Sequence, residues 1–132
     1  MKYLLDTNIC IYAQKGNEKI IEKIQENFND GIAISSITLA ELEYGIQASA
    51  FPQKNAGSLM RFLSIIEILP FDDKCANKYG KIRADLKKKG TLIGAIDMLI
   101  AAHGAAKGLI VVTHNTKEFE RVNELEIEDW FE

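Results

Sequence analysis

Short runs of consecutive apolar residues alternate along the chain with longer stretches in which apolar residues recur every three or four positions. The runs predict buried strands, and the longer stretches predict amphipathic helices. Strands are expected at residues 3–5, 32–34, 67–71, 109–112 and about 125–127. Helices are expected at residues 9–14, 18–29, 38–49, 54–66, 74–89, 95–106 and 116–121.

Apolar strands that alternate with helices indicate a parallel sheet covered on both faces, so we expect one α/β domain over residues 1–132. Pro70 favours the end of its strand or an edge of the sheet. Ligands of such sheets bind at the edge where the strands end. Polar residues follow three of the expected strands, and they should meet there: Asp6-Thr7-Asn8, Ser35-Ser36 and Thr113-His114-Asn115.

Composition adds limits on location and partners. The 132 residues are 47% hydrophobic with a net charge of −3, so bulk charge does not indicate a nucleic-acid binder, although a local patch can still act as one. Cys10 and Cys75 form no CxxC motif, which fits a reducing compartment. No apolar run approaches the roughly 20 residues of a membrane span, and Asp6 comes too early for a signal peptide. We expect a soluble cytoplasmic protein without a membrane partner.

Three acids stand out as candidate functional residues. Asp6 fits an N-cap or turn position as well as a site. Glu41 completes the segment Thr38-Leu39-Ala40-Glu41, a capping box, and this signal alone favours a structural role. Asp97 lies in a strongly apolar helix, where carboxylates are rarely buried unless paired or metal-bound; a role at the helix dipole is the alternative.

The available ligand types narrow the chemistry. His103 and His114 have no HxxxH or Cys/His partner, so zinc is not expected. Carboxylate oxygens favour Mg²⁺ or Mn²⁺ instead. The sequence contains no Walker loop, no GxGxxG motif and no defensible Ser-His-Asp grouping. An acidic cluster at the end of a parallel sheet therefore predicts metal-assisted attack of water on a phosphodiester.

Four stretches together resemble PIN domains, specifically the VapC toxins of bacterial toxin–antitoxin pairs: residues 4–8, 35–45, 93–101 and 112–119. The likeness extends over the whole chain. It implies a PIN-like three-layer domain with a central parallel sheet of about five strands flanked by helices. It also implies an Mg²⁺- or Mn²⁺-dependent endoribonuclease that is usually a homodimer. A VapB-type antitoxin would inhibit it and would be its only link to DNA, and structured RNA such as initiator tRNA would be the substrate.

The resemblance also assigns residues. Asp6, Glu41 and Asp97 match the metal-binding catalytic acids of the family, and Thr113 matches its small hydroxyl residue after the fourth strand. Many PIN domains place a fourth Asp where this chain has Asn115, with Glu118 three residues on, so a second metal site is left open. We expect Asn115 near the acids and Glu118 in the outer shell, and we take all six residues as candidate catalytic residues.

Weaker signals concern RNA and partner proteins. Six basic residues lie between Lys78 and Lys89 against one acid, and four of them are candidate RNA-binding residues: Lys78, Lys81, Arg83 and Lys87. A solvated helix face explains these charges equally well.

Apolar stripes on the helices at 18–28 and 54–66 favour a homodimer, and we expect a groove near the acids that accepts an antitoxin tail.

Two other functions remain as alternatives. A PIN-fold module without activity would serve as a binding partner or co-repressor of an antitoxin, but the presence of all three acids argues against it. A phosphatase or receiver-type domain that uses an aspartyl phosphate would favour a DxD motif after the first strand, and Asp6-Thr7-Asn8 lacks the second acid.

Overall fold

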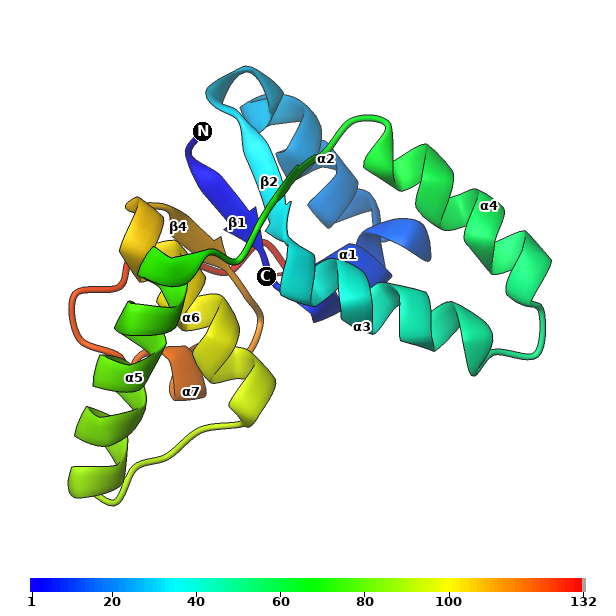
Figure 1. The fold of residues 1–132 in the computed structure, drawn as a ribbon. Coiled ribbons are helices and arrows are strands. Elements are labelled where there is room, and N and C mark those ends of the chain that lie inside the picture. Colours follow the sequence, from blue (N-terminus) through cyan, green and yellow to red (C-terminus); the bar gives the residue numbers. More distant parts are fainter. Residues whose placement is uncertain (132) are drawn as a thin grey trace.

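A five-stranded sheet forms the middle of the molecule in the computed structural model, which describes residues 1–131. The strands lie in the order β3-β2-β1-β4-β5, and every neighbouring pair is parallel. Helices cover the sheet on both sides (Figure 1), which confirms the predicted three-layer α/β fold. The strands are β1 (Tyr3–Leu5), β2 (Ile32–Ser35), β3 (Glu67–Leu69), β4 (Ile110–Val112) and β5 (Ile127–Glu128).

Within residues 1–131, seven α-helices and one 3₁₀ turn accompany these strands, and each predicted bound lies within three residues of the observed one. Pro70 follows the edge strand β3, as its inability to donate to a ladder predicts. The helices are α1 (Thr7–Gln14), α2 (Glu18–Asn27), the 3₁₀ turn η1 (Phe28–Asp30), α3 (Ser36–Gln47), α4 (Pro52–Leu63), α5 (Asp73–Lys88), α6 (Ala95–Lys107) and α7 (Thr116–Phe119).

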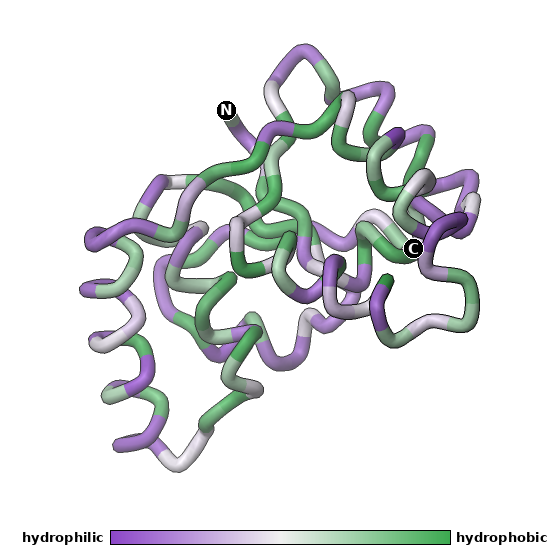
Figure 2. Tube along the Cα trace, turned by 45° about the vertical axis from the view of Figure 1, so that its right-hand side comes forward, coloured by the Kyte–Doolittle hydropathy of each residue, from purple (hydrophilic) through white to green (hydrophobic). Residues whose placement is uncertain are grey.

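Successive strand residues point to opposite faces of the sheet and so build two separate cores. Tyr3 and Leu5 of β1 pack with residues of α1 to α4, whereas Leu4 between them packs with α5, α6 and α7. Hydrophobic segments accordingly gather at the central strands, and the outer turns of α5 are hydrophilic (Figure 2). None of the helices within residues 1–131 is long and apolar enough to cross a membrane.

The start of α3 differs from the prediction in a way that matters for Glu41. We expected the helix to begin near Thr38, but it begins at Ser36, and Ser35 is its N-cap. The Ser35 hydroxyl accepts a hydrogen bond from the Ile37 backbone N–H at 3.1 Å. The capping-box interpretation of Glu41 is therefore wrong, because a serine at the end of the strand caps the helix earlier than the pattern suggested.

The prediction for α6 also needs a correction. Its apolar sequence predicts burial along its whole length, and most residues from Met98 to Gly104 are indeed buried. The first turn, however, lies at the surface, where Ala95 and Ile96 are exposed and Asp97 is half-buried. The carboxylate therefore sits where the helix emerges from the core.

Candidate active site

Asp6 directly follows β1, the central strand of the sheet, and is 3% exposed. Its backbone N–H donates to the Val112 carbonyl of β4 at 2.9 Å, which fixes the residue between two strands. It occupies the N-cap position of α1, but its side chain makes no capping hydrogen bond. The carboxylate Oδ2 instead accepts a hydrogen bond from the Thr113 hydroxyl at 2.8 Å. Asp6 therefore occupies an N-cap position, but its carboxylate bonds to Thr113 after β4 and does not cap α1.

Thr113 and Asn115 connect Asp6 to the other acids. The buried Thr113 Oγ1 donates to Asp6 and accepts the Asn115 backbone N–H at 2.9 Å. The Asn115 side-chain amide then donates to Asp97 Oδ2 at 3.2 Å and to Glu118 Oε2 at 2.7 Å. One chain of hydrogen bonds therefore runs from β1 to α6 and α7 through the loop after β4. Asn115 lies near the acids, as expected.

Glu41 joins the group through a threonine that the sequence pattern did not single out. The Thr7 hydroxyl donates to Glu41 Oε1 at 2.6 Å and lies 3.3 Å from the hydroxyl oxygen of the buried Thr38. The only signal for Thr7 was its place directly after Asp6. Glu41 is half-buried, and its charge acts on Asp6 by raising the pKa of that carboxyl.

Burial and neighbouring polar groups shift the pKa values of these acids. Burial raises the pKa of Asp6; the Thr113 hydrogen bond opposes this shift, and the Glu41 charge adds to it. Burial, a hydrogen bond with Glu118 and the charge of Asp6 raise the pKa of Asp97 to about 7. The pKa of Glu118 is lowered, mainly by its hydrogen bonds with Asp97 and Asn115.

The donor set fits a hard divalent cation. Within residues 1–131, no lysine or arginine forms an ion pair with Asp6, Glu41, Asp97 or Glu118. Among these acids only Glu118 is acted on by a basic side chain of residues 1–131, that of Arg121, which forms no ion pair with it, and a bound cation would relieve the repulsion between the carboxylates. In the same described range, no three carboxylate, imidazole or thiol groups lie close enough to hold one metal ion together. The arrangement suits a cation that keeps several waters and takes one or two carboxylates, as Mg²⁺ does.

The basic residues proposed for RNA lie on a different part of the molecule. Lys78, Lys81, Arg83 and Lys87 are on α5, and none of them makes a hydrogen bond or ion pair with the acids in the part of the chain that the structure describes. Lys78 and Lys81 border a shallow hollow that Asn123 and Glu124 complete, while the Arg83 guanidinium donates to the Tyr79 hydroxyl at 2.8 Å. Their role in binding RNA stays a prediction.

Comparisons with known proteins agree over nearly the whole chain. A family model described as PIN domain matches residues 3–125. The chain is 44% identical to a "tRNA(fMet)-specific endonuclease VapC" of Salmonella typhimurium and 44% identical to a "Ribonuclease VapC2" of Rickettsia felis, with 98% of each chain covered in both cases. It superposes with a TM-score of 0.95 on a chain of the crystal structure of VapBC2 from Rickettsia felis bound to a DNA fragment from their promoter, with 43% identity, 98% of this chain and 99% of that chain covered.

Proposed function

Because the chain belongs to the PIN domain family, among its VapC ribonucleases, we propose that it is the toxin of a type II toxin–antitoxin system. In this proposal residues 1–132 form a single PIN domain that works in the cytoplasm as a metal-dependent endoribonuclease. Its substrate is structured RNA, with initiator tRNA as the specific candidate, since a relative 44% identical over 98% of both chains is named for tRNA(fMet). The observation that carries the proposal is the hydrogen-bond chain that joins Asp6 to Asp97 in a cluster without a basic ion-pair partner among residues 1–131.

The roles of the residues follow from their contacts. Asp6 and Asp97 would hold Mg²⁺ or Mn²⁺, and Glu41 would reach the cation through water, because no three carboxylates among residues 1–131 lie close enough to bind one ion together. When bound, the cation lowers the pKa of a coordinated water and screens the charge that develops on the phosphate. Thr113 fixes the Asp6 carboxylate through its hydroxyl, and Asn115 orients the carboxylates of Asp97 and Glu118.

The hydrolysis itself needs a water molecule aimed at phosphorus. Attack forms the new P–O bond, and the bond from phosphorus to one ribose oxygen breaks, so a proton must leave the water and another must reach the departing oxygen. We assign the orientation of this water to Glu118, whose carboxylate accepts the Asn115 amide at 2.7 Å and whose lowered pKa keeps it charged at neutral pH. The hydrogen bond from the Thr7 hydroxyl fixes the orientation of the Glu41 carboxylate.

The direct test uses purified protein and RNA. With Mg²⁺ or Mn²⁺ the chain is expected to cut initiator tRNA, and EDTA should stop the reaction until the metal is restored. Mapping of new RNA 5′ ends in cells that express the chain with and without its antitoxin identifies the site cut. Cleavage that continues at the full rate in EDTA would contradict the metal-dependent mechanism, and cleavage of other RNAs but not tRNA would contradict the substrate.

An antitoxin segment is the partner that fits the groove beside the acids. A groove of about 390 Å³ lies between α1, α3 and α4, and Glu41 forms part of its wall together with Leu42 and Ile46. Apolar antitoxin side chains would fill it, and a basic side chain would reach Glu41 and compete with the cation. The VapBC2 structure from Rickettsia felis contains promoter DNA, so we propose that this chain meets DNA only through its antitoxin.

A second copy of the chain would cover apolar surface that the fold leaves open. Leu59 and Phe62 of α4 are buried, but Met60 on the same helix is 74% exposed and Ile65 beyond its end is 49% exposed. Phe28, after α2, is also more than half exposed. We propose a homodimer that includes this surface, and light scattering that shows only monomer at micromolar concentrations would contradict it.

Glu118→Gln should slow RNA cleavage about tenfold, the lower end of what outer-shell changes cost, and should raise the Mg²⁺ concentration needed for activity. The glutamine side chain still offers an oxygen to Asn115, so the variant removes the charge while it keeps the hydrogen bond. Single-turnover rates at several Mg²⁺ concentrations measure both effects. Glu120→Gln, an exposed neighbour, is the control. If Glu118→Gln loses as much activity as Asp97→Asn, Glu118 is a primary ligand.

A further inference from the structure

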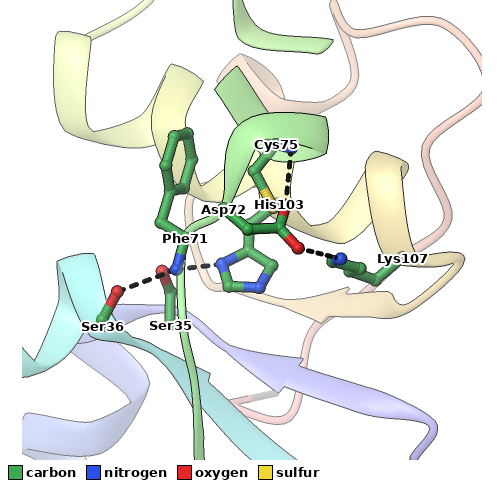
Figure 3. A network of polar contacts seen from close by, with 7 residues as sticks. All are labelled: Ser35, Ser36, Phe71, Asp72, Cys75, His103 and Lys107. Atoms are coloured by element: carbon green, nitrogen blue, oxygen red, sulfur yellow. Dashed lines mark hydrogen bonds and ion pairs between the residues drawn. The ribbon is translucent and has the colours of Figure 1, made fainter. Parts of the chain in front are cut away.

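A buried hydrogen bond joins the start of α3 to the middle of α6. His103 Nδ1 lies 2.8 Å from Ser35 Oγ, and both residues are fully buried (Figure 3). The edge of the Phe71 ring packs against the imidazole, with 5.8 Å between the ring centroids. The pair is 68 positions apart in sequence, so it fixes a tertiary contact rather than a local turn.

The direction of this bond follows from the other contact of Ser35. The Ser35 oxygen accepts the Ile37 N–H, and among residues 1–131 its hydroxyl hydrogen has no bonded acceptor other than His103 Nδ1, so we assign the hydroxyl as the donor. His103 then acts as the acceptor and carries its own proton on Nε2. No protein group among residues 1–131 lies within hydrogen-bonding distance of Nε2. Burial, followed by the charge of Lys107, lowers the pKa of His103, which keeps the ring neutral and able to accept.

This bond joins the two helices that carry Glu41 and Asp97 of the proposed nuclease site. Ser35 caps α3, the helix that carries Glu41, and His103 lies on α6, the helix that carries Asp97. Other bonds brace the same region: Ser36 accepts the Phe71 backbone N–H at 3.0 Å, and Asp72 at the start of α5 pairs with Lys107 at the end of α6. The two helices can therefore not shift against each other without breaking a buried polar contact.

A leucine of similar size would fill the place of His103 without leaving a buried nitrogen unpaired. Buried polar pairs of this kind contribute little net stability, and their use is to specify one geometry. We propose that His103 is a positioning residue: by accepting the Ser35 hydroxyl it sets the spacing between the helix that carries Asp97 and the helix that carries Glu41. The proposal rests on the function proposed above, because it concerns how the two acids meet one cation.

Three variants separate positioning from simple packing. His103→Leu removes the acceptor, and it should weaken Mn²⁺ binding to the folded protein about tenfold and lower kcat similarly, with KM for RNA unchanged. His103→Asn offers an oxygen close to the place of Nδ1 and should recover most of both losses. Ile100→Val, a buried change on the same helix, should lower Tm but leave Mn²⁺ affinity unchanged. Calorimetric Mn²⁺ titration, cleavage kinetics and thermal unfolding supply the readouts.

Each of these experiments either supports the positioning role of His103 or rules it out. A His103→Leu protein with wild-type Mn²⁺ affinity, or a His103→Asn protein as impaired as His103→Leu, overturns the proposal. If His103→Leu does not fold, Ser35→Gly removes the hydroxyl that bonds His103 while glycine remains a tolerated N-cap of α3, and this variant must show the same loss of Mn²⁺ affinity. A wild-type chain that binds Mn²⁺ but cuts no RNA refutes the nuclease function alone, and the Mn²⁺ titrations still decide the role of His103. A wild-type chain that binds no Mn²⁺ overturns both.

Discussion

Asp97→Asn is expected to reduce RNA cleavage by at least about 100-fold, or roughly 3 kcal/mol of transition-state stabilisation, while the protein stays folded. The variant removes one of the two carboxylates proposed to hold the cation, and the amide that replaces it adds no negative charge. Toxicity in cells should disappear with the activity. Single-turnover cleavage of RNA at saturating Mg²⁺ measures the loss.

The same substitution should stabilise the metal-free fold at neutral pH. Because the folded-state pKa of Asp97 is raised to about 7, the folded protein binds a proton that the unfolded chain has already lost over the range between about 4 and 7. The contribution of Asp97 to the free energy of unfolding therefore falls as pH rises through this range. The substituted asparagine carries no charge at any pH, so in EDTA the variant should match wild type below about pH 4 and be more stable above about pH 7. Since the carboxylate is half exposed, we expect a difference of about 1–2 kcal/mol.

Urea unfolding at about pH 4 and about pH 7.5 in EDTA measures this difference directly. Glu22→Gln makes the same change in charge at an exposed site on α2 and should alter neither the cleavage rate nor the pH dependence. An Asp97→Asn protein that cuts RNA at the wild-type rate would remove Asp97 from the catalytic site.

Gly104→Ala should lower the free energy of unfolding by about 1–3 kcal/mol, the usual cost of overpacking a core. Gly104 lies in the buried part of α6, and a Cβ there would be 2.5 Å from Val111 Cγ2 of β4 and 3.4 Å from Leu125 Cδ1. Val111 and Leu125 belong to the tightly packed core between α6 and the sheet. An added methyl group at residue 104 therefore fits only if α6 and β4 move apart. The prediction is checked by urea unfolding of both proteins.

Gly80→Ala is the matched control, because Gly80 is also inside a helix but no atom lies within 4 Å of the Cβ position. There the change should raise the free energy of unfolding by up to about 1 kcal/mol, since alanine restricts the unfolded chain and favours the helix. Changes of opposite sign in the free energy of unfolding at Gly104 and Gly80 would separate the effect of core packing from that of helix propensity. A Gly104→Ala protein as stable as Gly80→Ala would show that α6 can move away from β4.

Much of the fold followed from local patterns. The alternation of apolar runs with amphipathic stretches defined the strands and helices, and Pro70 indicated the sheet edge before the strand order was known. The first residue of each helix was less predictable, because more than one nearby residue could serve as the N-cap. Thr38 fitted a capping box with Glu41, but Ser35 holds the cap, since its backbone leaves β2 in the extended conformation that an N-cap needs.

The sequence indicated which acids would lie near the strand ends, but not which side chains hold them in place. Asp6, Glu41 and Asp97 were identified from strand ends, an apolar helix and family resemblance, and the structure places them at neighbouring elements. The bonds from Thr7 to Glu41 and from Asn115 to Glu118 depend on side-chain rotamers and on loops between distant segments, which no periodicity encodes. The Ser35–His103 pair is the same kind of case, because a histidine in an apolar helix looks like ordinary core.

The order of the strands has a consequence for the making of this protein. β1 is synthesised before the other four strands, yet its pairing with β4 and the Asp6–Thr113 bond join residues up to 107 positions apart. A nascent chain that still lacks the later of these residues has no assembled cluster of acids. The nuclease activity proposed for this chain therefore cannot arise until the residues after β4 have been synthesised, which separates in time the formation of β1 from the assembly of its site.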